Sequence, residues 1–215
     1  ITCRDWSSDV CSSDLVSLAI ESSVGVSHGW MDVAGPFKVT ESDRNRIITL
    51  DWKPALEVYR EVVEAHSGLY FTESNFFDIA KSYPFGINKL GTEKIVRDPV
   101  KVGPQNSLIC VGEVPQESYI HILTGNVDSL VHAAQTALLR SEKSFRGQSG
   151  QKTALFIDCI SRVLFLEDMF MQELDAVHRD TMPLIGALTI GEIANSGSDY
   201  LEFYNKTSVV AMMGD

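Results

Sequence analysis

Short apolar runs separated by polar turns occupy the start of the patterned part of the chain. The runs over residues 16–22 and 24–30 predict two strands. The runs over 37–42 and 45–52 are rich in β-branched residues, and the polar link between them predicts a hairpin. We therefore expect antiparallel sheet in this part of the chain.

Helical spacing of apolar residues follows at four places. Residues Lys53–His66 carry apolar side chains three and four positions apart, with a proline near the first turn and Gly68 after the last. A shorter helical patch over 73–83 stops at a proline. Two longer amphipathic runs, over 126–143 and 164–179, predict helices in the second half of the chain.

Strands are also predicted in the second half. Three runs, over 93–102, 107–115 and 118–125, are separated by turn residues and predict a meander. The apolar run 153–161 predicts a buried strand, and residues 185–210 predict a final hairpin. This mixture indicates an α+β fold of mixed, largely antiparallel sheets flanked by helices, or a layered α/β sandwich.

The composition is that of an ordinary globular protein. The chain has 215 residues, of which 44% are hydrophobic, so a full core needs no metal or disulfide. Its formal net charge is −11 with scattered basic residues, and we expect neither nucleic acid nor a membrane as a partner. The sequence shows no membrane-spanning run and no signal-peptide pattern, which predicts a cytoplasmic protein.

The first residues stand apart from this pattern. Residues 4–15, RDWSSDVCSSDL, have no periodicity and match the translation of a widely used sequencing adapter. We therefore expect residues 1–15 to be a disordered artefact on a gene fragment, and we give their two cysteines no role. The other two, Cys110 and Cys159, lie far apart in apolar runs, which predicts buried reduced thiols.

Common catalytic motifs are missing from the sequence. It contains no phosphate-binding loop, dinucleotide-binding fingerprint, nucleophile elbow or zinc-protease motif. Its five histidines have no close spacing, and neither Cys110 nor Cys159 belongs to a C-x-x-C pair. These observations count against hydrolases, kinases and metalloproteases.

Residues 158–162 form the first candidate site, because they end an apolar strand and loops at strand ends often contact ligands. Arg162 either clamps an anion with its planar guanidinium or lies on the surface, and the residues alone leave both open. Cys159 is more simply a core cysteine, since apolar neighbours raise the pKa of a thiol.

Glu192 is the second candidate. It follows Gly191 in an apolar run, and glycine in a strand marks a bulge or a close backbone approach. A carboxylate there either faces solvent or is buried with a partner. The residues alone favour an exposed edge glutamate, because a lone carboxylate is weak evidence of acid–base catalysis.

Two further polar positions are candidates. His28, within Ser27–Trp30, could ligate haem or line a pocket, although a lone histidine is more often structural. Asn205, within Tyr204–Thr207, could hydrogen-bond a ligand or cap its own turn.

Taken together, these motifs resemble the C-terminal FIST domain, named for F-box and intracellular signal transduction proteins. The shared features are an apolar strand ending in Cys-x-x-Arg, a helix, an Ile-Gly strand that continues into Gly-Glu-Ile, and Asn-x-Thr before the last strand. In this chain they are Cys159, Arg162, Gly186, Gly191–Ile193, Asn205 and Thr207. The region 25–61 resembles the end of the N-terminal FIST domain, which precedes the C-terminal one in this family.

The resemblance implies two domains and a sensory role. Residues 16–70 would be the end of an N-terminal FIST domain, and residues 71–215 a C-terminal one. The implied protein is a bacterial cytoplasmic sensor without a cofactor, not an enzyme, and it binds a small ligand such as an amino acid. Its implied partners are signalling proteins such as histidine kinases or cyclic-dinucleotide enzymes.

The resemblance also implies ligand-binding positions, namely Arg162, Glu192, Asn205, Tyr204 and Cys159. Arg162 would hold a ligand carboxylate and Glu192 an amine, while Asn205 and Tyr204 would make orienting hydrogen bonds.

Two alternatives remain open. Some members of the family are described as haem-binding nitric-oxide sensors, which would make His28 an axial ligand. An enzyme using Cys159 or Glu192 would need a base within hydrogen-bond reach of its nucleophile, and no histidine is near either residue in the sequence.

Overall fold

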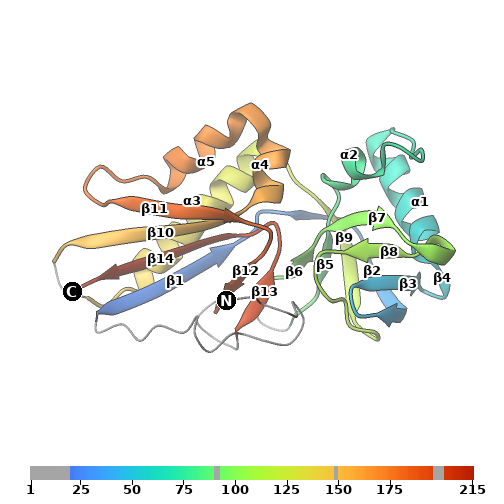
Figure 1. The fold of residues 1–215 in the computed structure, drawn as a ribbon, viewed down its shortest axis with the longest axis horizontal. Coiled ribbons are helices and arrows are strands. Elements are labelled where there is room, and N and C mark those ends of the chain that lie inside the picture. The colour runs from blue at the N-terminus through green and yellow to red at the C-terminus, as the bar shows by residue number, and fades with distance from the viewer. Residues whose placement is uncertain (1–19, 90–92, 148–149, 196–200) are drawn as a thin grey trace, which may run out of the picture.

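The computed structural model describes residues 20–89, 93–147, 150–195 and 201–215. Figure 1 shows two lobes side by side, each built on its own sheet. The adapter-like residues 1–15, which we expect to be disordered, lie outside the described ranges. Within those ranges, no helix is both long enough and apolar enough to cross a bilayer.

The first lobe, which we call the four-stranded lobe, contains a mixed sheet. Its strands lie in the order β1 (Glu21–Ser27), β14 (Ser208–Gly214), β10 (Lys152–Cys159) and β11 (Leu184–Thr189). Strand β14 is antiparallel to both of its neighbours, whereas β11 runs parallel to β10. Three helices lie on one face of this sheet, namely α3 (Val127–Ser144), α4 (Ile160–Leu166) and α5 (Phe170–Val177) (Figure 1).

Helix α3 begins at a capping box. The side chain of Asn126 accepts the Ser129 backbone N–H at 2.8 Å, and the Ser129 hydroxyl accepts the Asn126 N–H at 3.1 Å. Its apolar face then packs with α5 on the sheet, where Ala134, Leu138, Phe156, Val177 and Val210 form a buried cluster.

The second lobe, which we call the curled lobe, contains an antiparallel sheet. Its strands are ordered β6 (Ile95–Arg97), β5 (Phe85–Ile87), β9 (Tyr119–Thr124), β2 (Met31–Asp43), β3 (Arg46–Leu50), β8 (Leu108–Cys110) and β7 (Pro99–Val102), and β4 (Lys53–Pro54) pairs with β3. Strand β2 pairs with β9 and with β3, and register shifts in both pairings mark bulges that bend it. The sheet curls because this long central strand is bent.

Two helices complete the curled lobe, α1 (Ala55–Ser67) and α2 (Phe76–Ala80). The fully buried Tyr59 of α1 stacks against Phe76 and Phe85, and its hydroxyl donates to the Tyr83 carbonyl at 2.7 Å. The short strands β12 (Glu192–Ala194) and β13 (Glu202–Tyr204) pair with each other at the boundary between the lobes (Figure 1).

The structure confirms the predicted α+β fold with largely antiparallel sheets. The helices predicted over 53–66 and 126–143 are α1 and α3, and the hairpin predicted over 37–52 is β2–β3. Both Cys110 and Cys159 are buried free thiols, as predicted.

The predicted meander over 93–125 is wrong in its strand order. Strands β7 and β8 pair, but β3 and β2 lie between β8 and β9 in the sheet. The run 93–102 is also divided between β6 and β7, because Asp98 turns toward Lys206, whose Nζ lies 3.4 Å from its carboxylate. The local sequence pattern shows neither the order of the strands in the sheet nor the contact between Asp98 and Lys206.

Two predictions near the C-terminus are also wrong. The helix predicted over 164–179 is broken into α4 and α5, because Glu167 adopts a left-handed φ of 50° and a 3-10 turn follows. The hairpin predicted over 185–210 is wrong in its extent: β12 and β13 pair antiparallel as a short hairpin, whereas β11 belongs to the sheet of the four-stranded lobe and pairs with β10.

Both sheets take strands from either side of residue 70. The four-stranded lobe joins β1 to β14, and the curled lobe joins β2 to β9. The domain division predicted at residues 16–70 and 71–215 concerns the family's domains and stays a prediction.

Gly25 is required for the packing of α3 on β1. A Cβ atom built there would lie 1.9 Å from the Ala137 carbonyl oxygen, which belongs to the helix backbone. We expect Gly25→Ala to lower the free energy of unfolding by at least about 3 kcal/mol, because the helix must move away from the sheet. Urea denaturation measures the change.

Gly68 provides the matched control. It has a left-handed φ of 71° at the end of α1, and nothing lies within 4 Å of an added Cβ. Gly68→Ala should therefore cost only about 1 kcal/mol. An equal loss for both variants would contradict the packing role of Gly25.

Candidate ligand-binding site

Six charged side chains are buried at or near the boundary between the lobes, and we call them the buried ionic cluster. They are Asp98, Asp158, Arg162, Glu173, Glu192 and Lys206, each exposed by no more than 1%. Strand β10 and helix α4 place Asp158 and Arg162 four residues apart, so both side chains reach the same centre.

Arg162 is completely enclosed and its guanidinium is fully bonded. Its Nε lies 3.2 Å from Asp158 Oδ1 and donates to Glu173 Oε1 at 2.9 Å, and Nη2 donates to the same Glu173 oxygen. The remaining N–H groups donate to the carbonyls of His28 (2.7 Å), Leu130 (2.9 Å) and Lys206 (3.3 Å). In this arrangement every guanidinium N–H has a protein acceptor, so none is left for a ligand.

Lys206 is the second buried cation. Its Nζ donates to the Lys81 carbonyl at 2.8 Å, lies 3.4 Å from Asp98 and sits 5.1 Å from the centre of the Trp30 ring. The Lys206 carbonyl accepts the Trp30 indole N–H at 3.0 Å. Burial lowers the pKa of Lys206, although Asp98 opposes this effect. The turn before β14 therefore ties the two lobes together.

The cluster has more carboxylates than cations. Four carboxylates, from Asp98, Asp158, Glu173 and Glu192, face two cations, which leaves a surplus of two negative charges if all are ionised. Within the described residues, five buried side-chain oxygens have no hydrogen-bond partner, namely Asp98 Oδ1, Asp158 Oδ2, Glu173 Oε2, Glu192 Oε2 and Asn205 Oδ1. All five are acceptors. The cluster therefore lacks donors and positive charge.

Burial raises the pKa of Asp158 well above its ordinary value. Arg162 acts in the opposite direction, whereas the neighbouring carboxylates of Glu173 and Glu192 raise this pKa further. The second oxygen of Asp158 is thus a site where a proton or a ligand cation stabilises the fold.

Glu192 is buried, so the exposed edge glutamate favoured by the residues alone is wrong. The Thr189 hydroxyl donates to Glu192 Oε1 at 2.9 Å, while Ile193 on the other face of β12 is exposed. Burial raises the pKa of Glu192 to about 7. Gly191 allows the close approach that its position suggested, because an added Cβ would lie 2.4 Å from the Phe203 ring.

Cys159 and Asn205 meet at one carbonyl. The Cys159 Sγ lies 3.6 Å from the Ile190 oxygen, and Asn205 Nδ2 donates to the same oxygen at 3.3 Å. Burial, and next the charge of Glu192, raise the pKa of Cys159 to about 12, so its thiol is protonated at neutral pH. Such a thiol is a poor nucleophile.

The structure brings the five predicted positions into one region. Arg162, Cys159, Glu192 and Asn205 lie in or beside the buried ionic cluster, and Tyr204 is the β13 partner of Glu192, with its side chain in an apolar cluster. No ion pair joins Arg162 to Glu192 among the described residues, because Arg162 pairs with Asp158 and Glu173.

Sequence reasoning missed Asp98, Glu173 and Lys206 as site residues, and it gave Asp158 no ligand-binding role although this residue begins the candidate segment 158–162. Asp98 interrupts an apolar run, and Asp158 precedes Arg162 by one helical turn, so both carried a local signal. Glu173 and Lys206 lie in polar surroundings in the sequence and carried none.

The surroundings of His28 do not fit an axial haem ligand. Its Nδ1 accepts the Trp30 N–H at 2.9 Å, and its Nε2 lies 4.0 Å from the Glu93 carboxylate. Burial lowers the pKa of His28 to about 4, so the imidazole is neutral. The haem alternative therefore gains no support from the surroundings of His28.

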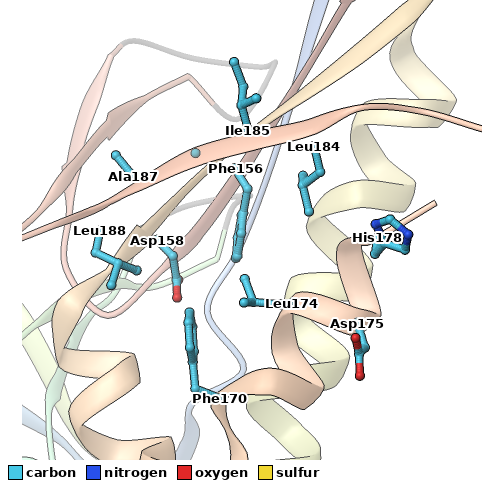
Figure 2. A pocket seen from close by; sticks show the side chains of 11 residues that line it. Phe156, Asp158, Phe170, Leu174, Asp175, His178, Leu184, Ile185, Ala187 and Leu188 are labelled. Carbon is cyan, nitrogen blue, oxygen red and sulfur yellow. The ribbon is translucent and has the colours of Figure 1, made fainter. Parts of the chain in front are cut away.

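An open cavity of about 420 Å³ adjoins the cluster, and we call it the β11–α5 groove. Figure 2 shows Asp158, Leu188 and Phe170 near one end and His178 at the other, with Phe156 and Leu174 between them. Asp158 is thus shared between the buried ionic cluster and the groove.

Arg162 holds two buried carboxylates, and removing it would leave both without a counter-charge. We expect Arg162→Leu to lower the free energy of unfolding by about 3–5 kcal/mol. Chemical denaturation of the variant measures the loss. Arg60→Leu is the control, because Arg60 makes an exposed pair with Glu64 at 3.7 Å and should cost less than about 1 kcal/mol. Similar losses for both variants would contradict the role given to Arg162.

Glu192 should make the stability depend on pH. Its folded-state pKa of about 7 lies above the ordinary 4.5, so the folded protein binds this proton more tightly than the unfolded chain. The resulting stabilisation, about 3 kcal/mol, is complete below pH 4.5 and is lost as the pH rises through about 7.

We therefore expect Glu192→Gln to match the wild type at pH 5 and to exceed its stability at pH 8.5. The glutamine keeps an oxygen that can accept the Thr189 hydroxyl, so packing changes little. Urea denaturation at both pH values is the measurement. If the free energy of unfolding changes between pH 5 and pH 8.5 by the same amount in the variant as in the wild type, Glu192 does not titrate in this range.

One protein family matches this chain. The family model described as the FIST C domain matches residues 55–195, which is about two thirds of the chain. Neither a curated protein nor a solved structure gives a significant match. The matched range contains Asp98, Asp158, Arg162, Glu173 and Glu192, so most of the buried ionic cluster lies within it. The chain belongs to the FIST C domain family.

Proposed function

We propose that this chain binds an amino acid or a similar small ligand in the cytoplasm and reports the bound state to a signalling protein. FIST C domains are a family of signal-transduction sensor domains, which supports a sensory role. The observation that carries the proposal is the set of five buried side-chain oxygens without hydrogen-bond partners, in a cluster where four carboxyl groups face two cations. The ammonium group of an amino acid supplies both the donors and the positive charge.

The position of the cluster supports a role in signalling. Asp98 of the curled lobe accepts the hydroxyl of Ser161 on α4 at 2.8 Å and lies close to Lys206. A ligand that changes the charge of the cluster therefore changes contacts that join the two lobes. The proposed partners are a histidine kinase or a cyclic-dinucleotide enzyme, as the family resemblance implies.

The residues of the cluster take different roles in this proposal. Asp158 and Glu192 accept the ligand's donors, and Asn205 offers its free Oδ1. Arg162 acts as a positioning residue, because its N–H groups hold Asp158 and Glu173 in place.

Catalysis has less support than sensing. The family is not known as catalytic, and the Cys159 thiol is protonated at neutral pH. Glu192 has a pKa in the range of a general base and hydrogen-bonds with the Cys159 thiol, but burial and the charge of Glu192 raise the pKa of that thiol to about 12, so it is not activated as a nucleophile. The enzyme alternative is therefore not pursued.

Amino acids should stabilise the folded protein. A ligand at one hundred times its Kd contributes about 2.7 kcal/mol, which raises the Tm of a chain of this size by roughly 5–10 °C. Thermal-shift measurements against the proteinogenic amino acids are the test.

The matched 2-hydroxy acids are the control, because they keep the carboxylate and side chain but replace the ammonium by a hydroxyl. Equal shifts for amino acids and hydroxy acids would overturn the role of the ammonium. No shift with any amino acid would overturn the proposed function.

A further inference from the structure

The residues that line the β11–α5 groove also indicate the chemical class of the ligand that it binds. Its lining residues include one fully buried charged group, Asp158, whereas the two other ionisable residues, Asp175 and His178, are exposed. Asp158 Oδ1 lies 3.2 Å from both Arg162 Nε and the Ser208 hydroxyl, while Oδ2 has no partner. An acceptor without a donor thus stands at the inner end of the groove.

We infer that the groove binds a primary amine with an apolar body, whose ammonium group pairs with Asp158 Oδ2. The inference rests on the proposed function and specifies the site and the chemical class of its ligand. Amino acids with large apolar side chains belong to this class, and so do simple alkylamines and arylalkylamines.

The charge of the site decides which end of the ligand enters first. An ammonium group pairs favourably with the ionised form of Asp158, in a cluster where four carboxyl groups face two cations. A carboxylate or phosphate there would add a negative charge to a buried region already rich in carboxyl groups, which is strongly unfavourable. The inner end of the groove therefore selects cations.

The apolar side chains that line the groove favour a ligand with an apolar body. Phe156 and Leu174 come from the sheet and from α5, and Leu188 of β11 is 48% exposed beside Asp158 (Figure 2). A ligand with an apolar body removes this surface from water, which favours binding in proportion to the apolar area covered. A body that carries further charges would lose this contribution.

Phe170 covers the inner end of the groove. Figure 2 shows its ring directed at the Asp158 carboxylate, and Oδ2 has essentially no solvent-exposed surface. The ring must turn aside before an ammonium group reaches this oxygen. Phe170 is the first residue of α5 and follows the break in the helix at Glu167, so a small change at the break can move it. An aromatic ring beside the carboxylate also suits an ammonium ion.

Isothermal titration calorimetry with isoamylamine, phenethylamine and leucine tests the inference. We expect Asp158→Asn to weaken binding at least tenfold, because it removes the charge yet keeps an oxygen for Arg162 and Ser208. Asp175→Asn is the matched control, since it removes a carboxylate from the exposed end of the same groove. It should weaken binding less than threefold.

A second pair of variants tests the groove without altering a buried polar group. Leu188→Trp should fill the space beside Asp158 and abolish binding. Leu139→Trp is the matched control, because Leu139 of α3 is 47% exposed, much like Leu188, and does not line the groove, so binding should be unchanged. Circular dichroism shows whether each variant is folded. If Asp158→Asn does not fold, the two tryptophan variants still test the inference.

The outcomes separate this inference from the proposed function. If leucine binds but neither Asp158→Asn nor Leu188→Trp changes its affinity, the groove is overturned as the site while the sensor function stands. Binding of 4-methylpentanoate as tight as that of isoamylamine would also overturn the inference, because this acid lacks the ammonium group. If neither amino acids nor amines bind the wild type, both proposals fall.

Discussion

The burial of one guanidinium group is the constraint on which the boundary between the lobes depends. Arg162 is fully enclosed, and a charge in such a place is tolerated only when each N–H meets an acceptor. Those acceptors come from β10, α3, α5 and two backbone segments, at His28 and Lys206, so all of these must be placed around one planar group. Removing any of them leaves a buried donor unpaired, which makes the arrangement cooperative.

This constraint explains why the region is short of donors. Arg162 donates its five N–H groups to Glu173 and three carbonyls and also forms an ion pair with Asp158, and the second oxygens of Asp158 and Glu173 have no donor left to bind. The low dielectric of a buried site makes such unpaired oxygens costly, so a proton or a cationic ligand has a large effect there. A site of this kind is stable enough to fold and remains sensitive to what binds it.

The local sequence pattern was enough to predict some elements of this structure. The capped helix after Asn126 and the hairpin around Arg44 depend on neighbours in sequence, and both could be predicted. The burial of Glu192 and the placement of β2 and β3 between β8 and β9 depend on distant segments. Periodicity carries no information about such pairings, and the role of Lys206 could not be predicted because its partner Asp98 lies more than a hundred residues away.

The same contacts offer a physical route from the groove to the curled lobe. Phe170 begins α5 directly after the helix break at Glu167, whose carboxylate lies 3.0 Å from Lys81 Nζ on the curled lobe. The Lys81 carbonyl in turn accepts a hydrogen bond from the Lys206 ammonium group. A ligand that displaces Phe170 therefore acts on a segment that is bonded to the curled lobe through Glu167 and, on α4, through Ser161. For this displacement to signal, the ligand must bind one arrangement of the lobes more tightly than the other, and the charge it brings to Asp158 provides such a difference.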